Sequence, residues 1–272
     1  MASYDEITVS ALARLIGTPD CPTVLDVRTD EDFDDDPRLV PGAYRKSFED
    51  VLDLAEELRG RSVVVYCQKG LKISQGAAAL LRTAGVQAEV LEGGQFAWRD
   101  AKLPMVTTNR LPPLDISGRS VWVTRHRPKI DRIACPWLIR RFIDPKAQIL
   151  FVAASQVTNV AERFSATPFD IEDVFWSHRG ETCTFDTMIE EFGIRHDALT
   201  RLAAIVRGAD TNRHDLAPET AGLLAASLGL SRMFRNDLDQ LEAGMLLYDA
   251  FYRWARDATN EGHDWPAAKA KS

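Results

Sequence analysis

The sequence lacks any apolar run that approaches the roughly 18 residues of a membrane-spanning helix. Its first residues, Met-Ala-Ser-Tyr-Asp-Glu, carry acidic charge where a secretory signal peptide carries basic charge, and no apolar segment follows them. Basic residues are outnumbered, with 33 Lys and Arg against 40 Asp and Glu, and the net charge of −7 disfavours a nucleic-acid-coating surface. We therefore expect a cytoplasmic protein without a membrane or nucleic-acid partner.

Cysteine is also scarce. The four cysteines stand at positions 21, 67, 135 and 183, far apart and without a CxxC pair. This spacing predicts neither a disulfide framework nor a zinc ribbon, and in a reducing compartment we expect four thiols. The sequence shows no internal repeat. At 272 residues it has the length of one large domain or two of ordinary size.

The first hundred residues alternate short apolar segments with helical patterns, which predicts a parallel α/β sheet. An acidic run between the first strand and the next helix has the composition of a solvated loop. The expected strands are 23–27, 62–66 and 88–91, the expected helices are 8–16, 47–59, 73–83 and 96–101, and the acidic loop is 30–36.

Prolines and small polar residues in 104–118 have the composition of a linker. Beyond it we predict strands at 120–124, 148–153 and 173–177, and helices at 130–143, 185–192, 197–207, 218–229 and 237–257. The second domain is thus expected to be α+β and mainly helical. The predicted boundaries are an α/β domain over 1–105, a linker over 106–118, a second domain over 119–260 and a flexible tail over 261–272.

The segment Cys67-Gln-Lys-Gly-Leu-Lys-Ile-Ser74 lies where a predicted strand ends and a helix begins. Free backbone N–H groups and the helix dipole at such a turn favour a thiolate and attract anions. Gly70 permits a tight turn, and Lys69 and Lys72 add positive charge. A buried core cysteine is the alternative, because free cysteine is often buried. The combination of glycine, lysines and strand end favours a nucleophilic Cys67 in an anion-binding loop.

Several short motifs carry a resemblance to a known family. Leu25-Asp-Val-Arg28, Val40-Pro-Gly-Ala43, Tyr66-Cys-Gln-Lys-Gly-Leu-Lys72 and Leu91-Glu-Gly-Gly94 with Trp98 resemble the rhodanese family in order and spacing, over about residues 5–105. The resemblance implies a persulfide on Cys67, formed from a donor such as thiosulfate and passed to a thiol or cyanide. It implies that the amides of Gln68, Lys69, Gly70, Leu71 and Lys72 hold the anionic donor. No cofactor is implied for this chemistry.

The chain also departs from the family pattern. Lys72 stands where many rhodaneses have arginine, and a point charge in place of a bidentate fork can alter donor preference. The His that usually precedes Pro-Gly-Ala is absent. Related phosphatases use a longer loop than Cys67 to Lys72, so ester hydrolysis is the weaker reading. We expect Asp26 to be structural, and Arg28 is a candidate substrate contact.

A basic segment follows the first strand of the second domain. Arg125, Arg127, Lys129 and Arg132 form a candidate oxyanion site, since arginine forks suit such anions. A solvated face with intradomain ion pairs is the alternative. Cys135, among Ile133, Trp137 and Leu138, fits a buried position better than an activated thiol.

The segment Trp176-Ser-His-Arg-Gly-Glu-Thr-Cys-Thr-Phe-Asp186 leaves a predicted strand and enters a helix. His178, Cys183 and Asp186, with Glu181, could meet at this turn and bind a divalent transition metal. His214 is a further candidate ligand. An ordinary capped helix start would give the same pattern.

These two segments, with Ile205-Val-Arg-Gly-Ala-Asp210 and Leu241-Glu-Ala-Gly-Met-Leu-Leu-Tyr-Asp249, resemble the ChrB-type chromate-resistance domain over about 119–258. The resemblance implies a role with chromate, although some members carry a DNA-binding part where this chain has the rhodanese-like region. The leading hypothesis is a sulfurtransferase that uses Cys67, coupled to an oxyanion-response domain. The alternatives are a non-catalytic oxyanion or metal sensor in chromate or sulfur stress, and a protein that reduces chromate through its thiols.

Overall fold

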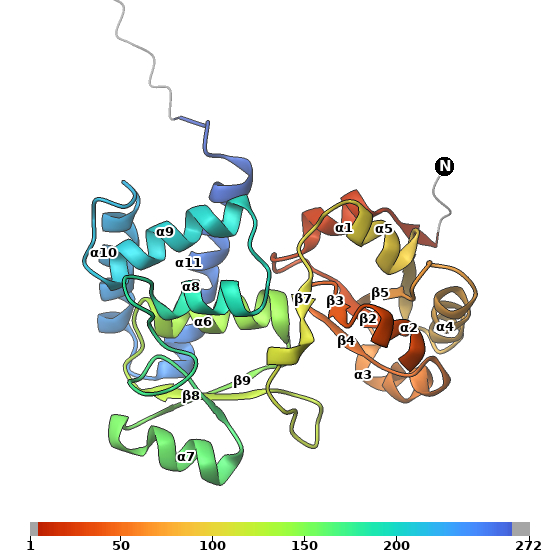
Figure 1. The fold of residues 1–272 in the computed structure, drawn as a ribbon, viewed down its shortest axis with the longest axis horizontal. Coiled ribbons are helices and arrows are strands. Elements are labelled where there is room, and N and C mark those ends of the chain that lie inside the picture. The colour runs from red at the N-terminus through yellow and green to blue at the C-terminus, as the bar shows by residue number, and fades with distance from the viewer. Residues whose placement is uncertain (1–4, 263–272) are drawn as a thin grey trace, which may run out of the picture.

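The computed structural model describes residues 5–262, which form two lobes joined side by side (Figure 1). A parallel sheet in the order β1-β6-β5-β2-β4 forms the N-terminal lobe. Its strands are β1 (Glu6–Ile7), β2 (Thr23–Asp26), β4 (Ala43–Arg45), β5 (Ser62–Tyr66) and β6 (Gln87–Leu91). Around it lie α1 (Val9–Leu15), α2 (Asp30–Asp35), the 3₁₀ helix η1 (Phe48–Leu54), α3 (Ala55–Leu58), α4 (Lys72–Thr83) and α5 (Gly94–Asp100). The predicted α/β architecture is confirmed.

The central strand β5 is apolar on both faces, as a strand covered on both sides must be. Val63 and Val65 pack into a core that includes Leu81 of α4. Val64 and Tyr66 point to the opposite face and join a different core. The strand therefore ends in a fully covered position, and the residue that follows it, Cys67, is buried in the core that includes Leu81.

Two predictions for this lobe are wrong in detail. The acidic run is not a loop but the short helix α2, because Thr29 caps it and its first three residues are acids that favour a helix N-terminus. The helix expected over 47–59 is divided into η1 and α3.

The C-terminal lobe is built on a three-stranded parallel sheet with β8 in the middle. Its strands are β8 (Val121–Arg125), β9 (Gln148–Val152) and β10 (Thr167–Pro168). Its helices are α6 (Asp131–Leu138), the π-helical turn η3 (Ile139–Ile143), the 3₁₀ turn η4 (Ala154–Gln156), α7 (Val157–Phe164), α8 (Thr184–Glu191), α9 (Asp197–Asp210), α10 (Thr220–Met233) and α11 (Asp237–Asp257). The α7 helix covers one face of the sheet and the remaining helices lie over the other (Figure 1). The predicted mainly helical α+β domain is confirmed.

The strand predicted over 173–177 does not form, and α7 was not predicted. Asp170 and Asp173 have φ angles of +53° and +59°, so the chain turns repeatedly where an extended strand was expected. The third strand is β10, and it is too short to show an alternating pattern.

The segment predicted as a linker is part of the contact between the lobes. Its strand β7 (Val106–Thr107) pairs antiparallel with β3 (Arg38–Leu39) of the N-terminal lobe, and the turn η2 (Thr108–Arg110) follows. The Thr107 N–H donates to the carbonyl of Phe192 in the C-terminal lobe at 2.9 Å. One apolar core runs through both lobes and includes Trp98 on one side and Trp137 on the other. The two domains therefore pack as one body.

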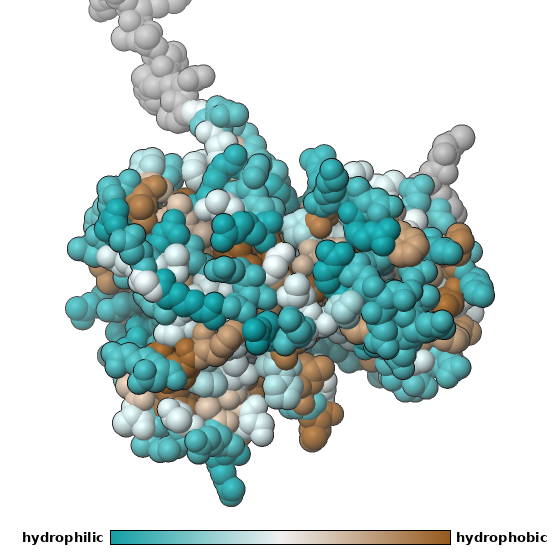
Figure 2. Space-filling model, in the orientation of Figure 1, coloured by the Kyte–Doolittle hydropathy of each residue, from teal (hydrophilic) through white to brown (hydrophobic). Residues whose placement is uncertain are grey.

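The surface shown in Figure 2 is largely hydrophilic, with an apolar protrusion where the loop before β8 runs in Figure 1. Leu114 and Ile116 are the exposed apolar residues of that loop. Across residues 5–262 no helix is both long and apolar enough to cross a membrane. Most of the predicted tail, 263–272, lies outside the described residues.

Candidate functional site

Cys67 lies directly after β5, at the carboxyl edge of the parallel sheet, and is only 5% exposed. Its Sγ lies 3.3 Å from the hydroxyl of Ser74, which is fully buried in the first turn of α4. The Ser74 hydroxyl also lies 3.2 Å from the Leu71 carbonyl, so its single proton can be donated to that carbonyl or, when the thiolate forms, to the sulfur. Ser74 was quoted in the sequence motif, but its role as a partner of the thiol was not predicted.

Two opposing effects set the pKa of Cys67. Burial is the largest and acts to raise it, because a thiolate is poorly solvated in the interior. The Ser74 side chain and the backbone N–H groups of Ser74, Leu71 and Lys69 point at the sulfur and together lower it. The second effect is greater, so the pKa of Cys67 lies below its ordinary value and the thiolate is favoured.

The loop from Gln68 to Lys72 follows Cys67 and directs the N–H groups of Lys69 and Leu71 at its sulfur, while the side chains of Lys69, Leu71 and Lys72 are exposed. Within residues 5–262 neither lysine forms an ion pair. In the same range, none of the N–H groups of Gln68 to Leu71 donates to a backbone carbonyl outside regular helices and strands. The loop therefore offers to an anion its backbone N–H groups, two of which already face the sulfur, and two positive charges that form no ion pair.

Two glycines hold the loop against the start of α5. Gly70 has a φ of +69°, and a side chain there would meet the Leu91 carbonyl oxygen at 2.6 Å and the Gly94 nitrogen at 2.7 Å. The N–H groups of Gln95 and Phe96 donate to the carbonyls of Cys67 and Gln68, both at 3.0 Å. The Gly93-Gly94 motif thus lets the α5 backbone approach the loop closely and fixes its shape.

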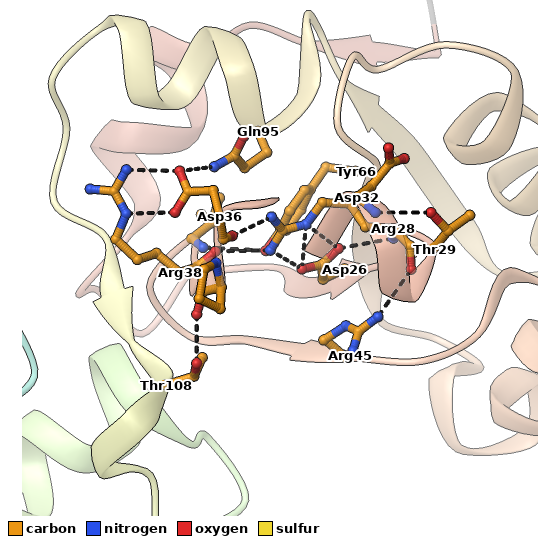
Figure 3. A network of polar contacts seen from close by, with 12 residues as sticks. Asp26, Arg28, Thr29, Asp32, Asp36, Arg38, Arg45, Tyr66, Gln95 and Thr108 are labelled. Carbon is orange, nitrogen blue, oxygen red and sulfur yellow. Dashed lines mark hydrogen bonds and ion pairs between the residues drawn. The ribbon is translucent and has the colours of Figure 1, made fainter. Parts of the chain in front are cut away.

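Arg28 does not contact this loop, and its predicted role as a substrate contact is wrong. Its side chain is buried, and it forms an ion pair with Asp26 at 2.6 Å and donates to the carbonyls of Asp36 and Arg38 at 2.8 Å each. Gln95 of α5 donates to the Asp36 carboxylate at 2.8 Å (Figure 3). A guanidinium buried this deeply is held by the nearest carboxylate and free carbonyls, so Arg28 supports the fold, as predicted for Asp26.

The four basic residues of the candidate oxyanion site do not meet. Arg125 and Arg132 converge on Asp170, with nitrogens 3.6 Å and 3.3 Å from its Oδ2. Arg127 instead donates to the Ser231 carbonyl at 2.7 Å, and Lys129 is exposed. The predicted four-residue anion site is therefore wrong. Arg127 bonds to the end of α10, and Arg125 and Arg132 neutralise the carboxylate of Asp170.

Asp170 belongs to a cluster of carboxylates around His178 that the sequence did not reveal as a unit. The His178 Nε2 lies 3.1 Å from Asp210 Oδ2, 3.5 Å from Asp170 Oδ1 and 3.7 Å from Asp131 Oδ2. Asp131 is completely buried at the start of α6, directly after Ile130, whose φ is +31°. The Tyr248 hydroxyl donates to the Ile130 carbonyl at 3.0 Å and holds this unusual backbone conformation.

The cluster brings together negative charges that are costly to bury. Burial, with Asp210 and Asp170 nearby, raises the pKa of Asp131 well above its ordinary value. Hydrogen bonds to Asp170 and Asp210 raise the pKa of His178 to about 10. The His178 imidazolium therefore offsets part of the negative charge.

Of the predicted metal ligands, His178 lies in this cluster, and Cys183 borders it at Asp131. Cys183 is the N-cap of α8: its Sγ lies 3.3 Å from Asp186 Oδ2, and Asp186 pairs with Arg207 at 3.0 Å. Asp186 is thereby committed to a helix cap and an ion pair, which removes it from the predicted ligand set. Burial raises the pKa of Cys183 well above its ordinary value, so its thiol is protonated.

Two further predicted side chains, His214 and Cys135, lie elsewhere in the C-terminal lobe. His214 is exposed and outside the cluster. Cys135 is completely buried, as predicted, and burial raises its pKa well above its ordinary value.

Comparisons with known protein families match both halves of the chain. The rhodanese-like domain family matches residues 8–101, and the family of the ChrB C-terminal domain matches residues 122–255. The match therefore places one family on each lobe of the structure.

Two curated relatives match parts of the chain. Protein ChrB of Cupriavidus metallidurans is 32% identical over 144 residues, which are 53% of this chain and 43% of that protein. An uncharacterized protein of Synechocystis is 42% identical over 57 residues, which are 21% of this chain and 31% of that protein. The chain thus spans less than half the length of either relative.

Solved structures similar to this chain cover about its first third. A rhodanese-related protein from Thermoplasma volcanium is 24% identical, with a TM-score of 0.33, and covers 38% of this chain and 98% of its own. A rhodanese-like domain protein from Staphylococcus aureus is 26% identical, with a TM-score of 0.30, and covers 35% and 90%. The chain combines a rhodanese-like domain in its first half with a ChrB C-terminal domain in its second.

Proposed function

We propose that this protein is a sulfurtransferase that carries sulfur as a persulfide on Cys67. The observation that supports the proposal is the set of backbone N–H groups and the Ser74 hydroxyl around one thiol, which favour its thiolate form. The thiolate is the nucleophilic form of cysteine. The exposed lysines of the same loop supply charge for an anionic donor.

The reaction has two steps. The Cys67 thiolate attacks the outer sulfur of thiosulfate, the sulfur–sulfur bond of the donor breaks, and sulfite leaves with the electron pair. The persulfide then transfers its outer sulfur to cyanide or a thiol, and the Cys67 thiolate is restored. The N–H groups of the loop and the side chains of Lys69 and Lys72 hold the donor and stabilise the charge on the leaving sulfite.

The test is to incubate the full chain with thiosulfate and cyanide, to quantify thiocyanate, and to record the intact mass after thiosulfate alone. We expect thiocyanate and a mass gain of one sulfur atom, both lost in Cys67→Ser. Cys135→Ser is the matched control, because that thiol is completely buried, and it should keep both signals. No thiocyanate from the wild-type protein, or equal activity in Cys67→Ser, would refute the proposal.

The C-terminal domain gives the proposal its setting. Chromate, sulfate and thiosulfate are small tetrahedral dianions, and we propose that the domain couples sulfur transfer in the cytoplasm to the presence of such an oxyanion. The alternative is that the protein is a sensor without transferase activity. Calorimetric titration of the full chain with chromate and with sulfate, beside the thiocyanate assay, separates the two.

A further inference from the structure

The cluster around His178 takes no part in sulfur transfer, yet four separate elements build it. Asp131 begins α6, Asp170 follows β10, His178 lies on the loop before α8, and Asp210 is the last residue of α9. Because these positions are far apart in the sequence, the fold brings three carboxylates and one imidazole to the same place.

The distances between the side-chain atoms suit a single bound ion. Carboxylate oxygens and imidazole nitrogens lie about 2.0–2.2 Å from a first-row divalent metal, so two ligands of one ion are at most about 4.4 Å apart. The three distances from His178 Nε2 to the carboxylate oxygens lie between 3.1 and 3.7 Å. One ligand atom each from Asp131, Asp170 and His178 all lie within 4.8 Å of one another, so a small contraction would bring the three within the range of one ion. Asp210 is outside this group and lies beside His178.

The partners of Asp131 supply a second, independent observation. Its Oδ2 accepts from the backbone N–H groups of Thr184 and Phe185, at 2.6 and 3.3 Å. Its Oδ1 is buried and has no hydrogen-bond partner. The oxygen nearest His178 is Oδ2, and the unpaired Oδ1 belongs to the same carboxylate. An unpaired carboxylate oxygen in the interior costs free energy, which a cation bound to this carboxylate would offset.

The loop that carries Asp170 and His178 is already fixed in place. The Asp170 N–H donates to the Trp176 carbonyl at 2.9 Å, and the Ser177 hydroxyl donates to the Ile171 carbonyl at 2.6 Å. The Thr184 hydroxyl donates to Asp170 Oδ1 at 3.0 Å, which orients this carboxylate toward the cluster. Such surrounding contacts are what hold metal ligands in position.

We propose that Asp131, Asp170 and His178 bind one divalent first-row transition metal ion, and that Asp210 holds His178 in position beside it. The imidazole favours a transition metal over Mg²⁺ or Ca²⁺, which take oxygen ligands. His178 and Asp210 are 39% and 20% exposed at their side chains, so one side of the site is open to water. Arg125 and Arg132 form ion pairs with Asp170. They thereby reduce the negative charge that the metal ion must balance.

The competing explanation is a network of ion pairs that binds no metal. A metal-binding experiment distinguishes the metal site from this network. The full chain is treated with EDTA, dialysed and titrated with MnCl₂, ZnCl₂ and MgCl₂ in a calorimeter. We expect one Mn²⁺ or Zn²⁺ per chain, with Mg²⁺ binding more weakly. Asp210→Asn and His178→Ala should each lower the Mn²⁺ affinity at least about 10-fold, and both sites are partly exposed, so both variants should fold.

The matched control is His214→Ala combined with Asp215→Asn, which makes the same chemical changes at exposed positions of the same domain. Circular dichroism confirms the fold of each variant. The control and Cys67→Ser should bind metal as the wild type does, so this test is independent of sulfur transfer. Absence of stoichiometric binding, or undiminished affinity in Asp210→Asn and His178→Ala, would overturn the assignment. Loss of binding in Cys183→Ser alone would do the same and restore the thiolate ligand set.

Discussion

Replacement of Gly70 by alanine is the most direct test of how the loop around Cys67 is held. Gly70 adopts a φ of +69°, a conformation that other residues rarely take, and a new Cβ would meet only backbone atoms. These atoms are the Leu91 oxygen at 2.6 Å and the nitrogens of Gly94 and Gly93 at 2.7 and 2.9 Å. Because no side chain can rotate away, the loop itself has to move.

The cost has two parts that can be separated. The left-handed backbone conformation costs an alanine about 1–2 kcal/mol, and the crowding of backbone adds about 1–3 kcal/mol. Gly60 is the matched control, since it has a φ of +77° and nothing lies within 4 Å of its added Cβ. Gly60→Ala should therefore show only the cost of the left-handed conformation. Gly70→Ala should show this cost together with that of the backbone crowding.

Urea unfolding and thiocyanate formation from thiosulfate and cyanide measure the two consequences. Gly70→Ala should be less stable than Gly60→Ala by about 1–3 kcal/mol and should lose on the order of 10-fold or more in kcat/KM, because the N–H groups that face Cys67 are displaced. Gly60→Ala should keep its activity. If the two variants are equally stable and equally active, the close contact between the loop and α5 does not fix the site.

Three further predictions concern other parts of the chain. Ser74→Ala should raise the pKa of Cys67 and slow its alkylation by iodoacetamide at neutral pH about 10-fold, because a hydrogen bond to the charged sulfur is lost; an unchanged pH profile would show that the backbone donors suffice. Burial lowers the pKa of His196 from 6.5 to about 4, so the folded state binds fewer protons than the unfolded state in this range and stability falls as the pH falls from 6.5 to 4. His196→Asn keeps an N-cap for α9 and should remove up to about 3 kcal/mol of that acid sensitivity in chemical unfolding at a series of pH values; an acid sensitivity equal to the wild type would refute the assignment. Asp249→Asn should destabilise the protein by about 2–4 kcal/mol, since the buried carboxylate accepts two hydrogen bonds from one arginine and one from a tryptophan, whereas Asp215→Asn at the surface should leave the unfolding midpoint nearly unchanged.

The N-terminal site was predictable because its signals are local. Cys67, Gly70 and Lys72 lie within one turn, and the apolar run Ser62–Tyr66 marked the strand that ends beside them. The support from α5 depends on Gly93 and Gly94. In the sequence these glycines are separated from the loop by α4 and β6. The pair is visible as a motif in the sequence, but its contact with the loop depends on tertiary packing.

The histidine cluster was only partly predictable because its residues have no common spacing. His178 was identified from its neighbours Cys183 and Asp186, yet those two serve the start of α8. Asp131 could have been suspected, since it is the lone acid of a basic segment at the start of a helix. Asp170 follows β10 and Asp210 ends α9, and only the tertiary fold brings these two positions to Asp131. No local sequence pattern reveals that contact.

Both sites nevertheless follow the same rule of parallel sheets, in which ligands bind beyond the carboxyl ends of the strands. Cys67 follows the end of β5, and Asp131 lies in the segment that leads from the end of β8 into α6. In each case a helix begins close to the reactive group and directs backbone N–H groups at a sulfur or a carboxylate. The difference is the charge that each site leaves unbalanced: the loop around Cys67 presents donors and lysines to an anion, whereas the cluster around His178 presents buried carboxylates to a cation. Under the two proposals, a negatively charged sulfur donor at one lobe and a metal ion at the other would use different residues and would not compete.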